Sequence, residues 1–243
     1  MALAVAAARA HGLPYLARRR KEPLEALLST RAEACLVFGG DGVALWDAEG
    51  CLRFSPGMAR LRVKRIDAGH LDDRLVRLAE LSPGASVLDC TLGLAADAIV
   101  LARAVGPHGK VVGVEKSPAL AALAGEGMAA YDFGPRSCQV EVVRGDFAEV
   151  LAASADGAFD CVFFDPMFAR PRRASPAFDA LRRFADRTPL SAAAVAEARR
   201  VARRWVIVKG SRYSTDLRAL GLSAEPGPRT ATVVWARLRA SGG

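Results

Sequence analysis

The run VFFDPMF at residues 162–168 combines residue types that can hold an aromatic amine. An aryl amine is a weak nucleophile because its lone pair is delocalised into the ring. A carboxylate and a backbone carbonyl that accept its N–H bonds hold it in line with an electrophile and stabilise the positive charge developing on nitrogen. Asp165 and the carbonyl of Pro166 are the candidate acceptors, and Phe168 is the candidate ring that stacks on the substrate. Because a lone Asp-Pro is also an ordinary turn after a strand, the prediction depends on the neighbouring strand ends.

The run VLDCTLGLAADA at residues 87–98 has the form of a strand, a tight turn and the start of a helix. Asp89 closes the strand, and Gly93 lets the backbone approach a ligand closely. The turn carries no G-x-G-x-x-G pattern, which argues against a nicotinamide dinucleotide site.

Two later strands also end in residues suited to an adenosine-type cofactor. Glu115 lies 26 residues after Asp89 and can accept hydrogen bonds from both hydroxyls of a ribose. Asp146 can accept from an adenine amine, and Phe147 can pack on the adenine ring. Carboxylates in these positions repel a phosphate, whereas a sulfonium cofactor carries none. The strand ends therefore indicate an adenosine-type cofactor without phosphate groups.

The elements that must position these residues alternate between helix and strand from residue 71 to 243. Near-continuous apolar strands separated by helices predict an α/β fold, namely a Rossmann-like doubly wound, mostly parallel sheet covered on both faces. The carboxyl ends of such strands carry the ligand site. We expect helices at 71–81, 95–105, 118–130, 148–153 and 191–203, and strands at 87–89, 110–115, 140–143, 159–165, 205–209 and 230–238.

Residues 1–70 predict a small N-terminal α+β region. Helical segments are expected at 2–9 and 24–30, followed by a meander of short strands at 35–38, 43–46 and 51–54. Alternation of apolar and basic residues then predicts one more strand at 59–65. That strand would present Arg60, Arg62 and Lys64 on one face, either as a platform for an RNA backbone or as a solvated edge strand.

The chain as a whole is basic, with a formal net charge of +8 and an isoelectric point of about 9.7. Positive charge favours contact with polyanions such as nucleic acid. Arginine forks suit phosphate groups, although the same residues can form an ordinary solvated face. We call Asp165 and the carbonyl of Pro166 the amine clamp, and the candidate RNA contacts near it are Arg170, Arg172, Arg173 and Lys209.

Several classes of protein are disfavoured by the composition. The five cysteines form no C-x-x-C pair and the three histidines have no ligand-like spacing, so we expect no metal site and reduced cysteines in a cytoplasmic protein. No apolar run approaches the roughly 20 residues of a membrane-spanning helix. The apolar start, residues 1–10, lacks the basic region of a signal peptide. The sequence does not indicate an oligomeric state.

The runs VLDCTLGLAADA, VVGVEKSP, FFDPMF and RWVIVKGSRY together resemble the bacterial small-subunit ribosomal RNA guanine-N2 methyltransferase J family, whose members are class I S-adenosylmethionine-dependent methyltransferases. The resemblance covers roughly residues 80–210. It departs from the family at Ala95, a family glycine, at Ala96, a family arginine, and at Met167, where amine methyltransferases carry a second proline. Serines are usual at positions 146 and 147. The cofactor positions that the resemblance implies are Asp89, Thr91, Gly93, Ala96, Asp97, Glu115, Lys116, Asp146, Phe147 and Asp165.

Three functions are consistent with the sequence. The first is transfer of a methyl group from S-adenosylmethionine to a guanine exocyclic amine in ribosomal RNA. The second is a methyltransferase for a small-molecule amine or a protein side chain, for which the basic segments are incidental. The third is a non-catalytic cofactor-binding or RNA-binding protein, which the degenerate glycine loop suggests and the amine clamp disfavours.

Overall fold

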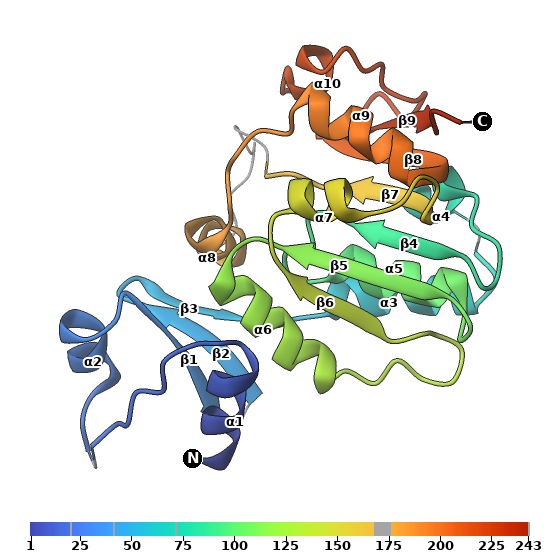
Figure 1. Cartoon of the computed structure of the whole chain (residues 1–243). Coiled ribbons are helices and arrows are strands. Elements are labelled where there is room, and N and C mark those ends of the chain that lie inside the picture. Colours follow the sequence, from blue (N-terminus) through green and yellow to red (C-terminus); the bar gives the residue numbers. More distant parts are fainter. Residues whose placement is uncertain (20, 41, 71, 168–175, 243) are drawn as a thin grey trace.

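A computed structural model of the chain describes every residue except 20, 41, 71, 168–175 and 243 (Figure 1). Its main body is a sheet of six strands in the order β6-β5-β4-β7-β8-β9. All neighbouring strands are parallel except β9, which runs antiparallel to β8. This arrangement confirms the predicted Rossmann-like, mostly parallel fold. The strands are β4 (Ser86–Asp89), β5 (Lys110–Glu115), β6 (Val140–Arg144), β7 (Phe159–Phe164), β8 (Ala202–Ser211) and β9 (Val233–Arg239).

Helices cover both faces of this sheet, which explains why its central strands are apolar along most of their length. Helices α7 and α9 lie on one face, and α3, α4 and α5 lie on the other (Figure 1). Helix α6 lies at the β6 edge and also contacts β1 and β2. The helices are α3 (Gly57–Asp67), α4 (Arg74–Ala79), α5 (Ala96–Val105), α6 (Pro118–Ala129), α7 (Phe147–Ala153), α9 (Ala192–Val201) and the short α10 (Asp216–Ala219).

Helix starts along the chain follow local capping chemistry. The side chains of Asp73, Ser117, Asp146 and Ser191 each accept a hydrogen bond from a backbone N–H in the first turn of the helix that follows. Such caps satisfy donors that have no partner within the helix. The helix predicted at 71–81 is shorter in the structure. Its cap at Asp73 sets the start of α4, and Glu80, with a left-handed φ of +47°, ends it.

The N-terminal region forms an antiparallel meander, as the turn residues predict. Strands β1 (Ala34–Gly39), β2 (Gly42–Asp47) and β3 (Gly50–Arg53) follow the helices α1 (Ala2–Ala10) and α2 (Leu24–Thr30). Leu45 and Leu52 of this sheet pack in one cluster with Leu123 of α6 and Ala180 of α8 (Pro176–Phe184). Helix α8, which the sequence pattern did not predict, is thus in contact with the meander (Figure 1).

The strand predicted at 59–65 is wrong, because these residues lie in helix α3. In a strand Ala59, Leu61 and Val63 would share one face. In the helix Ala59 is fully buried and Val63 packs against the core that includes α5, whereas Leu61 is 54% exposed. Helical spacing therefore buries residues four apart, and the apparent alternation with basic residues is incidental.

No helix in the described part of the chain is both long and apolar enough to cross a membrane.

Candidate active site

A pocket of about 1010 Å³ lies at the carboxyl ends of the parallel strands. The loops after β4, β5, β7 and β8 form its floor, and residues of α3 and α8 contribute to its walls. This is the position at which open α/β sheets bind ligands. Residues predicted at the four strand ends, namely Asp89, Glu115, Phe147 and Asp165, therefore line one pocket, whereas Asp146 is not among its lining residues.

A hydrogen bond within the loop after β4 and a second one from that loop to the loop after β7 fix this part of the pocket. Oδ1 of Asp89 accepts from the backbone N–H of Thr91 at 3.1 Å. The hydroxyl of Thr91 in turn accepts from the backbone N–H of Asp165 at 2.6 Å. Burial raises the pKa of Asp89 well above its ordinary value. Asp89 and Thr91 thus hold Asp165 at a fixed position beside the first loop.

The turn after β4 is closed by Glu115 at the end of β5. One oxygen of Glu115 accepts from the N–H of Gly93 at 2.9 Å and the other accepts from the N–H of Ser117 at 2.8 Å. Gly93 has a φ of +53° and Ala95 a φ of +61°. Glycine adopts this left-handed conformation readily, but alanine does so at a cost of about 1 kcal/mol. The turn therefore has, at Ala95, the left-handed backbone conformation that glycine adopts most readily.

Gly113 on β5 leaves room for the same turn. A Cβ atom at this position would lie only 2.4 Å from Cδ1 of Leu92, a residue that lines the pocket. The missing side chain therefore lets the loop pack closely on the strand that carries Glu115.

Lys116 links two acidic residues at the far end of the pocket. Its ammonium lies 3.1 Å from a carboxylate oxygen of Asp146 and 3.1 Å from one of Asp186. Asp146 caps α7, and the next residue, Phe147, lines the pocket and packs edge-to-face on Phe164. Asp186 was not predicted, because it follows α8 and no local pattern connects it to Lys116.

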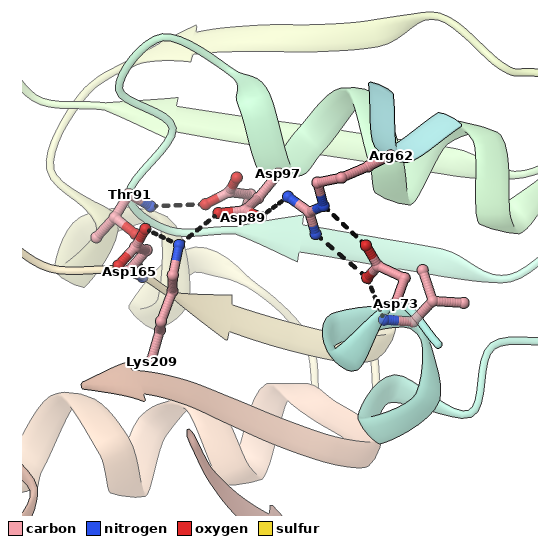
Figure 2. Close-up of polar contacts among 8 residues, drawn as sticks. Arg62, Asp73, Asp89, Thr91, Asp97, Asp165 and Lys209 are labelled. Atoms are coloured by element: carbon pink, nitrogen blue, oxygen red, sulfur yellow. Dashed lines mark hydrogen bonds and ion pairs between the residues drawn. The ribbon is translucent and has the colours of Figure 1, made fainter. Parts of the chain in front are cut away.

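A chain of ion pairs connects the pocket-lining residues Asp165, Lys209 and Asp97 to Arg62 and Asp73 (Figure 2). The ammonium of Lys209 lies 2.6 Å from Oδ2 of Asp165 and 3.2 Å from Oδ2 of Asp97. On the other side of Asp97, the guanidinium of Arg62 donates to Oδ1 at 2.5 Å. Arg62 also makes a two-pronged contact with Asp73, at 2.7 Å and 3.2 Å. The chain joins α3, α4, α5, β8 and the loop after β7.

Burial and the ion pairs have opposing effects on the pKa values of these groups. Burial raises the pKa of Asp165, and Lys209 works against that shift. Burial also acts to raise the pKa of Asp97, but Lys209 and Arg62 outweigh it and lower the value. Burial acts to lower the pKa of Lys209, yet Asp165 and Asp97 raise it above its ordinary value. Lys209 is therefore a permanent cation in the pocket.

Two of the basic residues that we predicted to contact RNA point inward, and two remain exposed on a helix. Lys209 lies inside the pocket, and Arg62 is turned inward between two carboxylates. Arg60 and Lys64 remain exposed on helix α3, so the predicted strand platform is replaced by a helix. The predicted residues Phe168, Arg170, Arg172 and Arg173 lie outside the described residues.

The charges of the lining residues indicate which kind of ligand fits. Among the residues that the structure describes, five acidic side chains line the pocket, against two lysines. An acidic lining of this kind suits a sulfonium and an ammonium and disfavours a phosphate. The acidic lining residues are Asp89, Asp97, Glu115, Asp165 and Asp186, and the lysines are Lys116 and Lys209. The pocket therefore fits S-adenosylmethionine, which carries both cations and no phosphate.

Comparison with known proteins agrees with this chemistry. Residues 51–225 match the family model described as "Putative SAM-dependent methyltransferase". The chain is 36% identical over 203 residues to the uncharacterised protein YpiP of Bacillus subtilis (strain 168), covering 81% of this chain and 78% of that protein. It is 28% identical over 147 residues to ribosomal RNA small subunit methyltransferase J of Pseudomonas syringae pv. tomato, covering 56% of this chain and 54% of that protein.

A solved structure shares the fold across the whole chain. The SAM-dependent methyltransferase NGO1261 from Neisseria gonorrhoeae superposes with a TM-score of 0.64 at 19% identity, covering 100% of this chain and 93% of that structure. The match includes the N-terminal region as well as the six-stranded sheet. With a family model covering most of its length, the chain belongs to the S-adenosylmethionine-dependent methyltransferases, and S-adenosylmethionine is its cofactor.

Proposed function

We propose that this enzyme transfers a methyl group to the exocyclic N2 amine of a guanine in small-subunit ribosomal RNA. The observation that supports this most directly is the placement of Asp165. Its backbone is held by Thr91, its Oδ2 is held by Lys209, and it lines the pocket together with Pro166. A carboxylate held in this way is preorganised to accept a hydrogen bond from an amine.

The cofactor half of the pocket lies around β4, β5 and α7. In the proposed complex Glu115 accepts from the ribose hydroxyls, Asp146 accepts from the adenine amine, and Phe147 packs on the adenine ring. Asp97 and Lys116 lie beside this half and line the same pocket. When bound, S-adenosylmethionine supplies a methyl group that its sulfonium has already activated.

The proposed role of the clamp is to orient the acceptor amine. Asp165 and the carbonyl of Pro166 accept its two N–H bonds and direct the nitrogen lone pair at the methyl carbon. The new carbon–nitrogen bond forms as the carbon–sulfur bond breaks, and that electron pair stays on sulfur as a neutral thioether. The methylated amine then loses one proton to Asp165, whose pKa burial raises. Lys209 stays protonated and takes no part in this transfer.

An RNA substrate is supported by charge and by one relative. The chain carries a net charge of +8, and Arg60 and Lys64 are exposed on α3, the helix that contributes Met58 to the pocket wall. The Pseudomonas syringae relative is named as a small-subunit ribosomal RNA methyltransferase. We infer that exposed cations of this kind contact the phosphate backbone around the target base.

The test is methyl transfer from labelled S-adenosylmethionine to total RNA from a strain that lacks the gene, followed by mass spectrometry of the nucleosides. Labelled N2-methylguanosine supports the proposal. A different labelled nucleoside contradicts the guanine assignment. Label that enters small amines or protein but neither free RNA nor assembled small subunits contradicts RNA as the substrate.

A further inference from the structure

Three large apolar side chains that line the pocket are exposed. Met58 is 69% exposed, Tyr213 46% and Val233 37%, and all three line the pocket. Single exposed apolar residues are common on protein surfaces, but several that line one pocket are typical of a binding site. We call these three side chains the apolar rim.

The apolar rim lies beside the ion-paired clamp and away from the cofactor half. Val233 pairs with Ser211, two residues beyond Lys209 on β8, so Val233 and Lys209 project from the same face of the sheet. Met58 is four residues before Arg62 on α3 and therefore lies on the same side of that helix, one turn away. Val233 and Met58 thus lie on the same sides of their elements as Lys209 and Arg62, which belong to the ion-pair chain that holds Asp165.

The chemistry of the pocket beside the apolar rim differs from that of the cofactor half. Ser55, Ser211, Thr230 and Thr232 line it beside the apolar rim, and all four are uncharged. The carboxylate that an acceptor would meet is Asp165, which already contacts the ammonium of Lys209 at 2.6 Å. An alkylammonium approaching Asp165 would meet this like charge at close range. A neutral amine on a flat ring meets no such repulsion.

We propose that the apolar rim is the acceptor subsite and that its ligand is a neutral heteroaromatic amine, namely a nucleobase turned out of an RNA strand. The ring packs against Met58, Tyr213 and Val233, and its amine reaches Asp165. Enzymes that modify a base commonly extrude it and pack it between aromatic and apolar side chains. This inference rests on the proposed function, because it assigns the acceptor half of the same pocket.

The first experiment compares rim variants with a matched control in the RNA methyl-transfer assay. Met58→Ser and Val233→Ser each remove an apolar contact from the rim. Leu61→Ser makes the same kind of change on α3 at a side chain that is 54% exposed and lies outside the pocket lining. The rim variants are expected to raise KM for RNA by about tenfold or more, with unchanged calorimetric affinity for S-adenosylmethionine. If the rim variants and Leu61→Ser behave alike, the subsite assignment is wrong.

A second experiment needs no methyl transfer and therefore separates this inference from the proposed function. The enzyme is labelled with ¹³C at its methionine methyl groups, and Met58→Ser identifies the Met58 resonance. Guanosine is then added in the presence of S-adenosylhomocysteine, with spermidine as the alkylamine probe. A shift of the Met58 resonance with guanosine alone supports the subsite even if total RNA accepts no methyl group. No shift with guanosine, or an equal shift with spermidine, overturns it.

Discussion

The ammonium of Lys209 contacts Oδ2 of Asp165 at 2.6 Å, although the two residues are 44 positions apart in the chain. The same ammonium contacts Asp97, which in turn contacts Arg62 (Figure 2). Lys209 therefore contacts one oxygen of Asp165 and opposes the rise in pKa that burial causes there. We assign the other oxygen, Oδ1, to the acceptor amine. We propose that Lys209 is a positioning residue, because it acts on the acceptor amine only through its contact with Asp165.

Replacing Lys209 by methionine is expected to move the pH dependence of methyl transfer. Asp165 accepts the amine only as a carboxylate. Burial raises its pKa and Lys209 opposes that rise, so removing the ammonium raises the pKa further. The acid limb of kcat/KM against pH should then move to higher pH, and activity below the limb should fall about tenfold per pKa unit. Steady-state rates across a pH series measure this shift.

Lys209→Arg is the matched control, because it keeps a cation at the same place. Its acid limb should stay near that of the wild type, even if the larger side chain lowers the plateau. A Lys209→Met enzyme with a lower plateau but an unmoved acid limb would show that Lys209 acts only on the fold.

Replacing Asp165 by alanine is expected to reduce transfer by roughly a hundredfold to a thousandfold, because a preorganised acceptor is lost. Affinity for S-adenosylmethionine should change little, since the contacts assigned to the ribose and adenine lie at other strand ends. Single-turnover rates and calorimetry separate the two effects. Asp132→Ala, at an exposed carboxylate, is the control. An equal, strong loss of cofactor affinity and of activity would contradict the clamp role.

The strand ends were predictable because one pattern sets both fold and site. An apolar run that ends in an acid predicts a buried parallel strand and also places that acid at the carboxyl edge of the sheet. Asp89, Glu115 and Asp165 therefore line the same pocket, as their positions at strand ends predict.

Helix α3 and its role were not predictable from local pattern. Alternation of apolar and basic residues over 59–65 fits a strand, and only packing on α5 and two distant ion pairs favour the helix. Arg62 contacts Asp73 and Asp97, which are 11 and 35 positions away. Lys116 likewise contacts Asp186, which is distant in the sequence and follows α8. Contacts of this kind depend on topology, which the local sequence does not encode.

Replacing Glu115 by glutamine is expected to weaken binding of S-adenosylmethionine. The carboxylate accepts from Gly93 and Ser117 on its two oxygens, and an amide would present a donor to one of these N–H groups. Hydrogen bonds to charged groups contribute about 1.5–3 kcal/mol, so the dissociation constant should rise by roughly tenfold to a hundredfold. Calorimetry measures the change, and Glu141→Gln on the neighbouring strand is an exposed control. An unchanged dissociation constant would remove Glu115 from the cofactor site.

Replacing Arg62 by methionine is expected to destabilise the fold rather than weaken RNA binding directly. The change leaves Asp73 and Asp97 without the cation that both contact, and for these partly buried pairs the cost should be at most the roughly 3–5 kcal/mol of breaking a fully buried pair. Lys64→Met, at an exposed residue on the same helix, should change the free energy of unfolding by less than about 0.5 kcal/mol. Chemical denaturation at neutral pH measures both values.

The pH dependence of the Arg62→Met effect identifies its cause. Burial acts to raise the pKa of Asp97, but Lys209 and Arg62 outweigh it, so the folded pKa lies below the ordinary value. The stability that comes from this lowering is present above the unfolded pKa and is lost as pH falls through the folded pKa. The difference in unfolding free energy between wild type and Arg62→Met should therefore be largest at neutral pH and shrink in acid. A difference that stays constant across this range would mean that Arg62 stabilises α3 through the packing of its stem and not through its charge.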